Sequence, residues 1–519
     1  MSRVVGKNVL ESLTTGMYSK NKIVFREYIQ NSADAIDKAI ADGILEKNKN
    51  RIDISINQNR RQITIKDNGT GIPSKEVFNT LGDIGKSQKD YKSEKGFRGI
   101  GRLGGLGYCE ELQFITSFKG ESIKTITTWD CIKLKELLQP SKAKNMDVIE
   151  VVNAVTAERT EEENSDNHYF EVILTGIDKD NENLLDLVEI EDYLAQVSPV
   201  PYNFQRFSEL KKVKQKLIEK KLQVDEYNIF LNKEQIYKPY RNKVKAGKSE
   251  KDFIRDISFF EGYKDNGALF FLGWYGITDL SGMIKDADVN GLRVRKHNIL
   301  IGDNHSLDSF FGNNSTYQAF NRWFVGEIYV FENDLIPNAR RDDFEKNKIY
   351  TAFKKEVEKT TYNVLRKLPH SHSKERSEKK AISTAEKTID SIKTEMKKGL
   401  TTIGKHRLIE KIENTEKRVK KITGNRPKVE KNKISDASNK NGVVLEKKGN
   451  VLDDLKKIKT EVEKSNHFKT DRIPTSYPKT VRKIVQRVFE VIDTVLPEGQ
   501  AQELQELIIE ELSIEQKKK

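Results

Sequence analysis

A carboxylate and an amide that could act together on a bound phosphate lie one helical turn apart near the start of the chain, at Glu27 and Asn31, and Asp34 follows them. A carboxylate can take a proton from water, and an amide oxygen can ligate a hard cation such as Mg²⁺. An ordinary solvated helix face is the alternative interpretation, because surface helices also carry polar stripes.

A second carboxylate, Asp67, opens the turn Asp-Asn-Gly-Thr-Gly directly after an alternating apolar stretch. A buried carboxylate at a strand end could accept a hydrogen bond from an adenine amino group. Gly69 and Gly71 would let the backbone approach the base closely. The alternative is a strand-terminating turn capped by the aspartate.

Residues 96–107 contain six glycines in twelve positions, which is dense for a structural turn. Exposed backbone N–H groups ahead of a helix form a cradle for phosphates. No Gly-Lys-Ser/Thr closes this segment, so it does not fit the Walker loop. The stretch 81–107 therefore predicts a mobile lid over a nucleotide.

The elements that must hold these residues follow from periodicity. Apolar side chains at three- and four-residue steps predict a helix over about 25–40, with its polar stripe opposite the apolar one. Isoleucines at alternate positions on both sides of a polar turn at 57–61 predict a β-hairpin over 51–66. Asp67 then stands at the end of the second strand.

The segments 25–37, 67–73, 84–87 and 96–107, in this order, resemble those of the GHKL ATPases, which include gyrase, the HtpG chaperones, histidine kinases and MutL. The resemblance implies a Mg²⁺-dependent ATPase. In it Glu27 is the general base, Asn31 the magnesium ligand, Asp34 a neighbouring polar position and Asp67 the adenine-reading carboxylate. The remaining implied nucleotide contacts are Gly69, Gly71, Lys86, Ser87, Gly99, Gly101, Gly104, Gly105 and Gly107.

Two later segments narrow the resemblance toward the HtpG-type chaperones. Residues 291–301 resemble a strand of their middle domain, and 334–344 resemble their catalytic loop. The resemblance implies that Arg341, with Arg340 as the fallback, stabilises charge on the γ-phosphate. A solvated basic pair is the alternative. Residues 96–99, Gly-Phe-Arg-Gly, are more similar to MutL.

One family feature is displaced. GHKL proteins usually close the site with a Gly-Thr pair at the start of a late strand, whereas the candidate strand 168–177 carries Thr175-Gly176, reversed and at its far end. Whether Thr175 contributes to the site is left open.

The fold expected is α/β (α+β): an α/β sandwich of the GHKL (Bergerat) type, an α+β middle domain of the ribosomal-S5-like kind, and a helical C-terminal region. The domain limits expected are 1–195 for ATP binding, 200–345 for the middle domain, 346–423 for a basic helical arm, 424–450 for a flexible linker, and 451–519 for a C-terminal helical region.

Composition is consistent with these domains. The chain has 519 residues, 33% of them charged, a net charge of +13 and only two cysteines. Few cysteines favour a reducing compartment. The first residues lack the apolar core of a signal peptide, and no run of about 18 apolar residues is present. We therefore expect a cytoplasmic protein without membrane contact.

The basic charge gathers in 371–433, with 19 Lys/Arg against 9 Asp/Glu, and apolar residues recur there every seven positions from Ile382 to Ile403. This pattern predicts a coiled coil or helical arm. The lysines could track phosphates of duplex DNA, or they could form a solvated face. Two amphipathic helices near 480–496 and 500–515 need a partner, and the resemblance implies a homodimer.

Several functions remain open for the ATP cycle. A chaperone-like machine acting on a protein client is favoured by the middle-domain resemblance. An ATP-gated clamp on duplex DNA, like MutL or microrchidia proteins, is favoured by the basic arm. A sensor in antiphage defence is a third hypothesis. A non-enzymatic scaffold conflicts with the presence of Glu27, Asn31 and Asp67.

Overall fold

The computed structural model describes the chain except residues 1–4, 8, 12–19, 85–93, 97–98, 143–145, 248, 280–281, 398–399, 401, 422–436, 466–472, 474–476 and 518–519. Contacts divide it into two compact units, Met1–Pro369 and His370–Lys519. Every candidate site residue that is described lies in the first unit.

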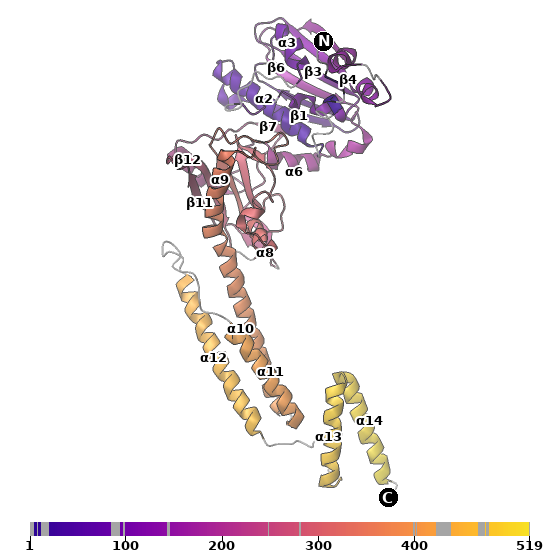
Figure 1. Ribbon diagram of the computed structural model, residues 1–519, viewed down its shortest axis with the longest axis vertical. Coiled ribbons are helices and arrows are strands. Elements are labelled where there is room, and N and C mark those ends of the chain that lie inside the picture. The colour runs from indigo at the N-terminus through magenta and orange to yellow at the C-terminus, as the bar shows by residue number, and fades with distance from the viewer. Residues whose placement is uncertain are drawn as a thin grey trace. The chain divides into compact units, whose positions relative to one another are not determined.

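The first unit opens with an eight-stranded mixed sheet, of which β1, β3, β4, β6 and β7 are labelled in Figure 1. The strand order is β5-β4-β3-β6-β2-β1-β7-β8. Its strands are β1 Ile52–Asn57, β2 Gln62–Asp67, β3 Glu111–Ser117, β4 Ile123–Asp130, β5 Thr156–Glu162, β6 Tyr169–Thr175, β7 Ile229–Leu231 and β8 Glu234–Gln235. All neighbours are antiparallel except β1 and β7. The α/β sandwich expected from the sequence is confirmed.

The predicted first helix is α2, Ile23–Ala41, and it packs on this sheet. Its apolar stripe, Phe25, Ile29, Ala33 and Ile36, is almost fully buried in the core. That core also contains apolar residues of the shorter helices α3 Ser74–Gly82, α4 Cys131–Leu138, α5 Val148–Val155 and α6 Leu187–Val197. The predicted hairpin is β1–β2, with Ile54 opposite Ile65.

A second, five-stranded sheet has the order β11-β12-β15-β13-β14. Its strands are β11 Asp256–Tyr263, β12 Leu269–Ile277, β13 Gly291–Lys296, β14 Ile299–Ile301 and β15 Val325–Val330. Residues of β12 and β15 contribute to two hydrophobic cores, one on each face of this sheet. One core also contains residues of α7 (Lys211–Glu219), and the other contains residues of α9 (Lys348–Thr360). A small β9–β10 pair (Lys243–Ala246, Ser249–Phe253) and the short α8 (Ser315–Gln318) complete this part.

Residues 291–301 form two strands, which corrects the single strand expected there. His297 and Asn298 have positive φ values of 51° and 59°, so the chain reverses between β13 and β14. A two-residue turn with both residues left-handed matches the twist of antiparallel strands. The tip of this hairpin contacts the segment before β7, where the Asn298 side chain donates a hydrogen bond to the Asp225 carbonyl.

The second unit is helical. The structure places helices at α10 Lys367–Lys397, α11 Thr402–Lys420, α12 Ala437–Lys464, α13 Lys479–Val495 and α14 Glu498–Lys517. The seven-residue stripe of α10 is buried with apolar residues of α11 and α12, so partners within the chain cover it. Helix α12 begins inside the range 424–450 that was expected to be a flexible connection, while residues 424–436 lie outside the described part of the chain. Helices α13 and α14 share a separate small core.

None of the helices described is long and apolar enough to cross a membrane.

Candidate functional site

Helix α2 presents Glu27, Asn31 and Asp34 on its polar side. Glu27 is only 7% exposed, and its Oε1 accepts no hydrogen bond from the residues that the structure describes. The nearest cations are Arg341, whose Nε lies 3.6 Å from that oxygen, and Arg26, whose Nε lies at 4.0 Å. A buried carboxylate oxygen beside a guanidinium, with no hydrogen bond of its own, has a lone pair left for a water molecule.

The loop 334–344 brings Arg341, and not Arg340, to this carboxylate. Arg341 is buried and in the left-handed region at φ 55°. Its N–H donates to Asn338 O at 3.1 Å, and Gly302 N donates to its carbonyl at 2.8 Å. The Arg340 side chain is 60% exposed and pairs with Asp342 at 3.5 Å. Its carbonyl accepts a bond from Arg26, so Arg340 contributes its backbone.

Asp34 holds the beginning of the glycine-rich segment. Its two carboxylate oxygens accept the N–H groups of Lys95 at 2.8 Å and Gly96 at 2.9 Å. The guanidinium of Arg341 donates to the carbonyl of the same Lys95 at 2.5 Å. Helix α2 and the arginine loop therefore meet at one residue of the predicted lid.

The glycine-rich segment continues as the 3₁₀ helix η2, Gly101–Gly107. A Cβ on Gly101 would lie 2.4 Å from Glu27 Oε2, and one on Gly105 would lie 2.5 Å from the Tyr28 hydroxyl. Gly99 has φ 69°, and Gly104 is buried. These glycines allow close packing against α2. Lys86 and Ser87 lie outside the described residues.

Arg102, within η2, ties the glycine segment to α3. Its guanidinium donates to Leu81 O at 3.3 Å and to Asp83 O. Burial lowers the pKa of Arg102 to about 10. The sequence reasoning did not single out this arginine, because nothing in the local pattern shows where its side chain ends.

The turn after β2 packs against α2. Gly69 N donates to Asp67 Oδ1 at 2.8 Å, and a Cβ on Gly69 would meet the Ala35 Cβ at 2.6 Å. Gly71 has φ 68°, and a Cβ there would lie 2.0 Å from Ser117 O. Both glycines are therefore required by the protein's own packing, in addition to any approach to a base.

Thr175 lies at the wrong end of β6 to join this turn. It pairs with Gln62, whose side chain donates to its hydroxyl at 3.2 Å, whereas Asp67 pairs with Phe170. The hydroxyl beside the turn is instead that of Thr116 on β3, which accepts the Ile72 N–H at 2.8 Å. The alternating burial of β3 is the pattern that could have pointed to Thr116.

Asn31 is the residue suited to Mg²⁺. It lies half-buried one turn after Glu27 on α2. The described residues contain no group of three or more acidic, histidine or cysteine side chains around a point. A single amide oxygen still fits this ion, because Mg²⁺ usually keeps several waters and takes other ligands from the substrate phosphates.

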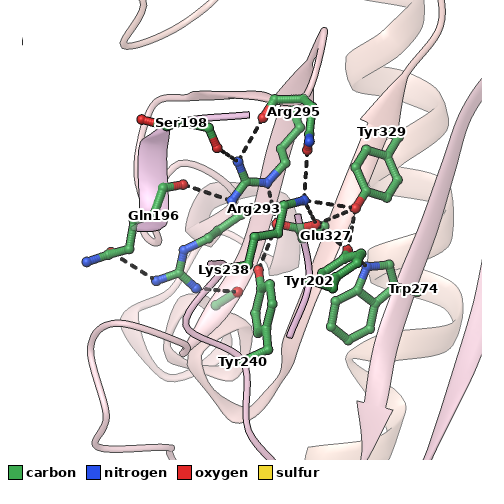
Figure 2. Close-up of polar contacts among 12 residues, drawn as sticks. Gln196, Ser198, Tyr202, Lys238, Tyr240, Trp274, Arg293, Arg295, Glu327 and Tyr329 are labelled. Atoms are coloured by element: carbon green, nitrogen blue, oxygen red, sulfur yellow. Dashed lines mark hydrogen bonds and ion pairs between the residues drawn. The ribbon is translucent and has the colours of Figure 1, made fainter. Parts of the chain in front are cut away.

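On the second sheet lies a buried polar cluster that the sequence reasoning missed (Figure 2). Glu327 of β15 accepts hydrogen bonds from Lys238 at 2.8 Å, Tyr202 at 2.6 Å and Tyr240 at 3.0 Å, and it is paired with Arg295 of β13. The neighbouring cations hold the pKa of the Glu327 carboxyl below its usual range, against the effect of burial.

The same cluster fastens the end of α6 to the second sheet. Arg295 donates to Gln196 O at 2.8 Å and Asn298 O at 2.9 Å. Arg293 donates to Ala287 O at 2.9 Å. Figure 2 shows these two arginines extending toward Gln196 and Ser198, the residues where the chain leaves α6.

Comparison with known proteins agrees with this geometry. Residues 18–161 match the family described as histidine kinase-, DNA gyrase B-, and HSP90-like ATPase. Chaperone protein HtpG of Wigglesworthia glossinidia brevipalpis is 37% identical over 144 residues, covering 24% of this chain and 22% of that protein. HtpG of Halalkalibacterium halodurans is 32% identical over 133 residues, covering 24% and 20%. HtpG of Buchnera aphidicola is 41% identical over 87 residues, covering 16% and 14%.

The matches thus span about a fifth of the length of these relatives. The family match over residues 18–161 includes α2, the β1–β2 hairpin, the Asp67 turn and the glycine segment. The N-terminal part of this chain, residues 18–161, is therefore a GHKL domain that resembles the HtpG chaperones.

Proposed function

We propose that the chain binds ATP with Mg²⁺ and hydrolyses it, and that the resulting conformational cycle acts on a protein client. The observation that carries the hydrolytic part is the pairing of Glu27 and Arg341. A buried carboxylate oxygen without a hydrogen bond lies 3.6 Å from a buried guanidinium that comes from the loop after β15.

In this mechanism Glu27 takes a proton from the attacking water while Arg341 stabilises the charge that develops on the γ-phosphate. Asp67 accepts a hydrogen bond from the adenine amino group, and the glycines of η2 lie along the phosphates. Mg²⁺, when bound through Asn31, neutralises phosphate charge. Lid closure excludes water other than the nucleophile.

The experiment that tests this function is ATP turnover by purified wild type beside Glu27→Ala. General-base catalysis contributes roughly 10²- to 10⁴-fold, so the substitution should lower kcat at least about a hundredfold. Nucleotide binding, measured by calorimetry, should persist. Equal turnover by the variant and the wild type would refute the role of Glu27.

A clamp on duplex DNA is the second candidate function, and the charge of the second unit favours it. Exposed basic residues line α10 and α11, among them Lys387, Lys393, Lys397 and Arg418. DNA affinity carried by such residues would fall steeply with salt. DNA-stimulated turnover that disappears when these four are changed to glutamine would support the clamp; turnover indifferent to DNA would support the client model.

Homodimerisation is part of both proposals. Helices α13 and α14 leave several apolar side chains exposed, namely Ile484, Val491, Val495 and Leu507. An apolar stripe of this kind needs a covering surface. Sedimentation at several concentrations, with Val491→Glu as the comparison, tests whether a second copy supplies it.

A further inference from the structure

We propose that Lys95 is a positioning residue that holds Arg341 beside Glu27, through a cluster of Lys95, Asp37 and Asp225 that we call the Lys95 cluster. This inference rests on the proposed ATP hydrolysis for its kinetic test. It also makes a structural prediction that does not depend on hydrolysis.

The side chain of Lys95 is anchored from two directions. It is 3% exposed, and its Nζ lies 2.6 Å from Asp37 Oδ2 and 3.3 Å from Asp225 Oδ2. Asp37 belongs to α2, while Asp225 lies in the segment that leads into β7. Tyr227 donates its hydroxyl to Asp37 at 2.7 Å, and its ring lies 5.4 Å from the ammonium.

The charge on Lys95 is retained although it is buried. Burial alone would lower its pKa, but the carboxylates of Asp225, Asp37 and Asp34 outweigh that effect and raise the pKa above its usual value. A buried ammonium with two carboxylate partners resists displacement, because moving it away from them would leave its own buried charge uncompensated.

The backbone of Lys95 is the part that touches the site. Its N–H donates to Asp34, and its carbonyl accepts the Arg341 guanidinium at 2.5 Å. The side chain fixes where this peptide lies, and the peptide in turn fixes the guanidinium whose Nε faces Glu27. Lys95 itself makes no ion pair with Glu27 within the described structure, so its effect passes through Arg341.

The second sheet reaches the same cluster. His297 Nδ1 lies 3.4 Å from Asp225 Oδ2, and Asn298 donates to the Asp225 carbonyl at 2.6 Å. The side-chain oxygen of Asn298 accepts a bond from Lys238 at 2.7 Å, which joins the turn to the Glu327 network of Figure 2. The Lys95 cluster therefore connects α2, the lid and the β13–β14 turn.

Packing around the cluster is close. The cavity between Lys95, Lys296, His297 and Arg341 has a volume of about 10 Å³, which is about the space of one water probe. Small movements of Lys95 must therefore be transmitted to Arg341, since there is little room to absorb them.

The kinetic test compares Lys95→Met with the wild type. A misplaced guanidinium should lower kcat roughly ten- to a hundredfold while KM for ATP stays within about threefold. Lys95→Arg, which keeps the charge, should recover part of the loss. Lys7→Met is the matched control, because Lys7 is also a buried lysine of this domain, but it donates to the carbonyls of residues 137, 139 and 142.

A double-mutant cycle asks whether the effect passes through Arg341. In an Arg341→Ala background, Lys95→Met should cause no further loss, because the residue it positions is already gone. Losses that multiply would overturn the inference, and so would a kcat for Lys95→Met equal to that of the wild type.

Hydrogen exchange gives the independent readout. In Lys95→Met, amides of 334–344 should exchange faster than in the wild type, while Lys7→Met leaves them unchanged. Absence of ATP turnover in the wild type would refute the proposed function. The positioning role of Lys95 would then be tested by hydrogen exchange alone. Unchanged exchange in 334–344 would overturn the positioning role whatever the turnover.

Discussion

Arg341 and Arg340 are neighbours in sequence, yet only one guanidinium faces Glu27. We expect Arg341→Ala to lower kcat about a hundredfold or more, because it removes the buried cation that, in the proposed mechanism, stabilises charge on the γ-phosphate. Arg340→Ala should change kcat less than about threefold, because its exposed pair with Asp342 contributes little. Steady-state ATPase assays of both variants check this.

The comparison of Arg341→Ala with Arg340→Ala contains its own control. Both variants lose one guanidinium from the same loop, so a general disturbance of the loop would lower both rates. Arg341→Lys should recover only part of the activity, since a lysine cannot bond Lys95 O and face Glu27 at once. A larger loss in Arg340→Ala than in Arg341→Ala would contradict the assignment.

Lys238 predicts a pH dependence of stability. Burial, followed by repulsion from Arg295, lowers its pKa to about 7, because Arg295 already neutralises Glu327 and leaves Lys238 as the excess cation. In the unfolded chain the pKa of a lysine side chain is about 10.4. Between these values the unfolded chain binds one more proton, so the free energy of unfolding rises with pH by up to about 1.4 kcal/mol per unit.

Urea unfolding at pH 7, 8 and 9 measures this slope. Lys238→Met should be less stable at every pH and should show a smaller increase from pH 7 to 9 than the wild type. Lys296, whose pKa is lowered to about 8 chiefly by burial, retains a part of the slope in both proteins. Equal slopes would mean that Lys238 stays protonated in the folded chain.

The sequence predicts single residues well where a local pattern governs them. The buried stripe of α2 and the placement of Glu27, Asn31 and Asp34 opposite it follow from helical periodicity. The Lys95 cluster has no such pattern: Asp37 and Asp225 are 58 and 130 residues from Lys95 along the chain. The fold alone decides which lysine meets which carboxylates.

Among the elements, the turn after β2 gives a sharp stability prediction. Gly71→Ala combines a positive φ with a Cβ 2.0 Å from Ser117 O, so backbone would have to move. We expect a loss of about 2–4 kcal/mol in unfolding free energy, together with weaker ATP binding. Chemical denaturation and calorimetry measure the two effects.

Gly43→Ala is the control for this turn. Gly43 has nearly the same φ, 70°, but a Cβ there has no neighbour within 4 Å. Its substitution should cost about 1–2 kcal/mol from backbone conformation alone, with ATP binding unchanged. Equal losses for the two variants would show that the contact with Ser117 is relieved without penalty.

The elements also show where sequence reasoning ends. The β1–β2 hairpin was predictable because its polar turn interrupts two alternating stretches. The β13–β14 hairpin was not, because the alternation of Leu292 to Arg295 runs directly into the polar residues Lys296–Asn298, with no glycine to mark a turn. Arg293 and Arg295 are also fully buried, so the polar positions of β13 do not mark a solvent face.

At the scale of the molecule, the candidate site belongs to no single sheet. Glu27 comes from a helix on the first sheet, and Arg341 from the loop after β15 of the second. Within Met1–Pro369, the Glu327 network joins β15 to the segment after β8, and the Lys95 cluster joins α2 to the segment before β7 and to the β13–β14 turn. The first unit therefore contains every described residue that the proposed hydrolysis requires.

A chain cut after Pro369 should consequently fold and hydrolyse ATP. We expect residues 1–369 to unfold cooperatively, and to retain turnover that Glu27→Ala abolishes, because Glu27, Asn31, Asp67 and Arg341 all lie in this unit. Any dependence of turnover on protein concentration or DNA in the full chain should disappear, since α11–α14 and all of α10 after Pro369 would be missing. A folded fragment without turnover would show that residues 370–519 contribute to the reaction itself, which would place part of the catalytic cycle in the helical unit.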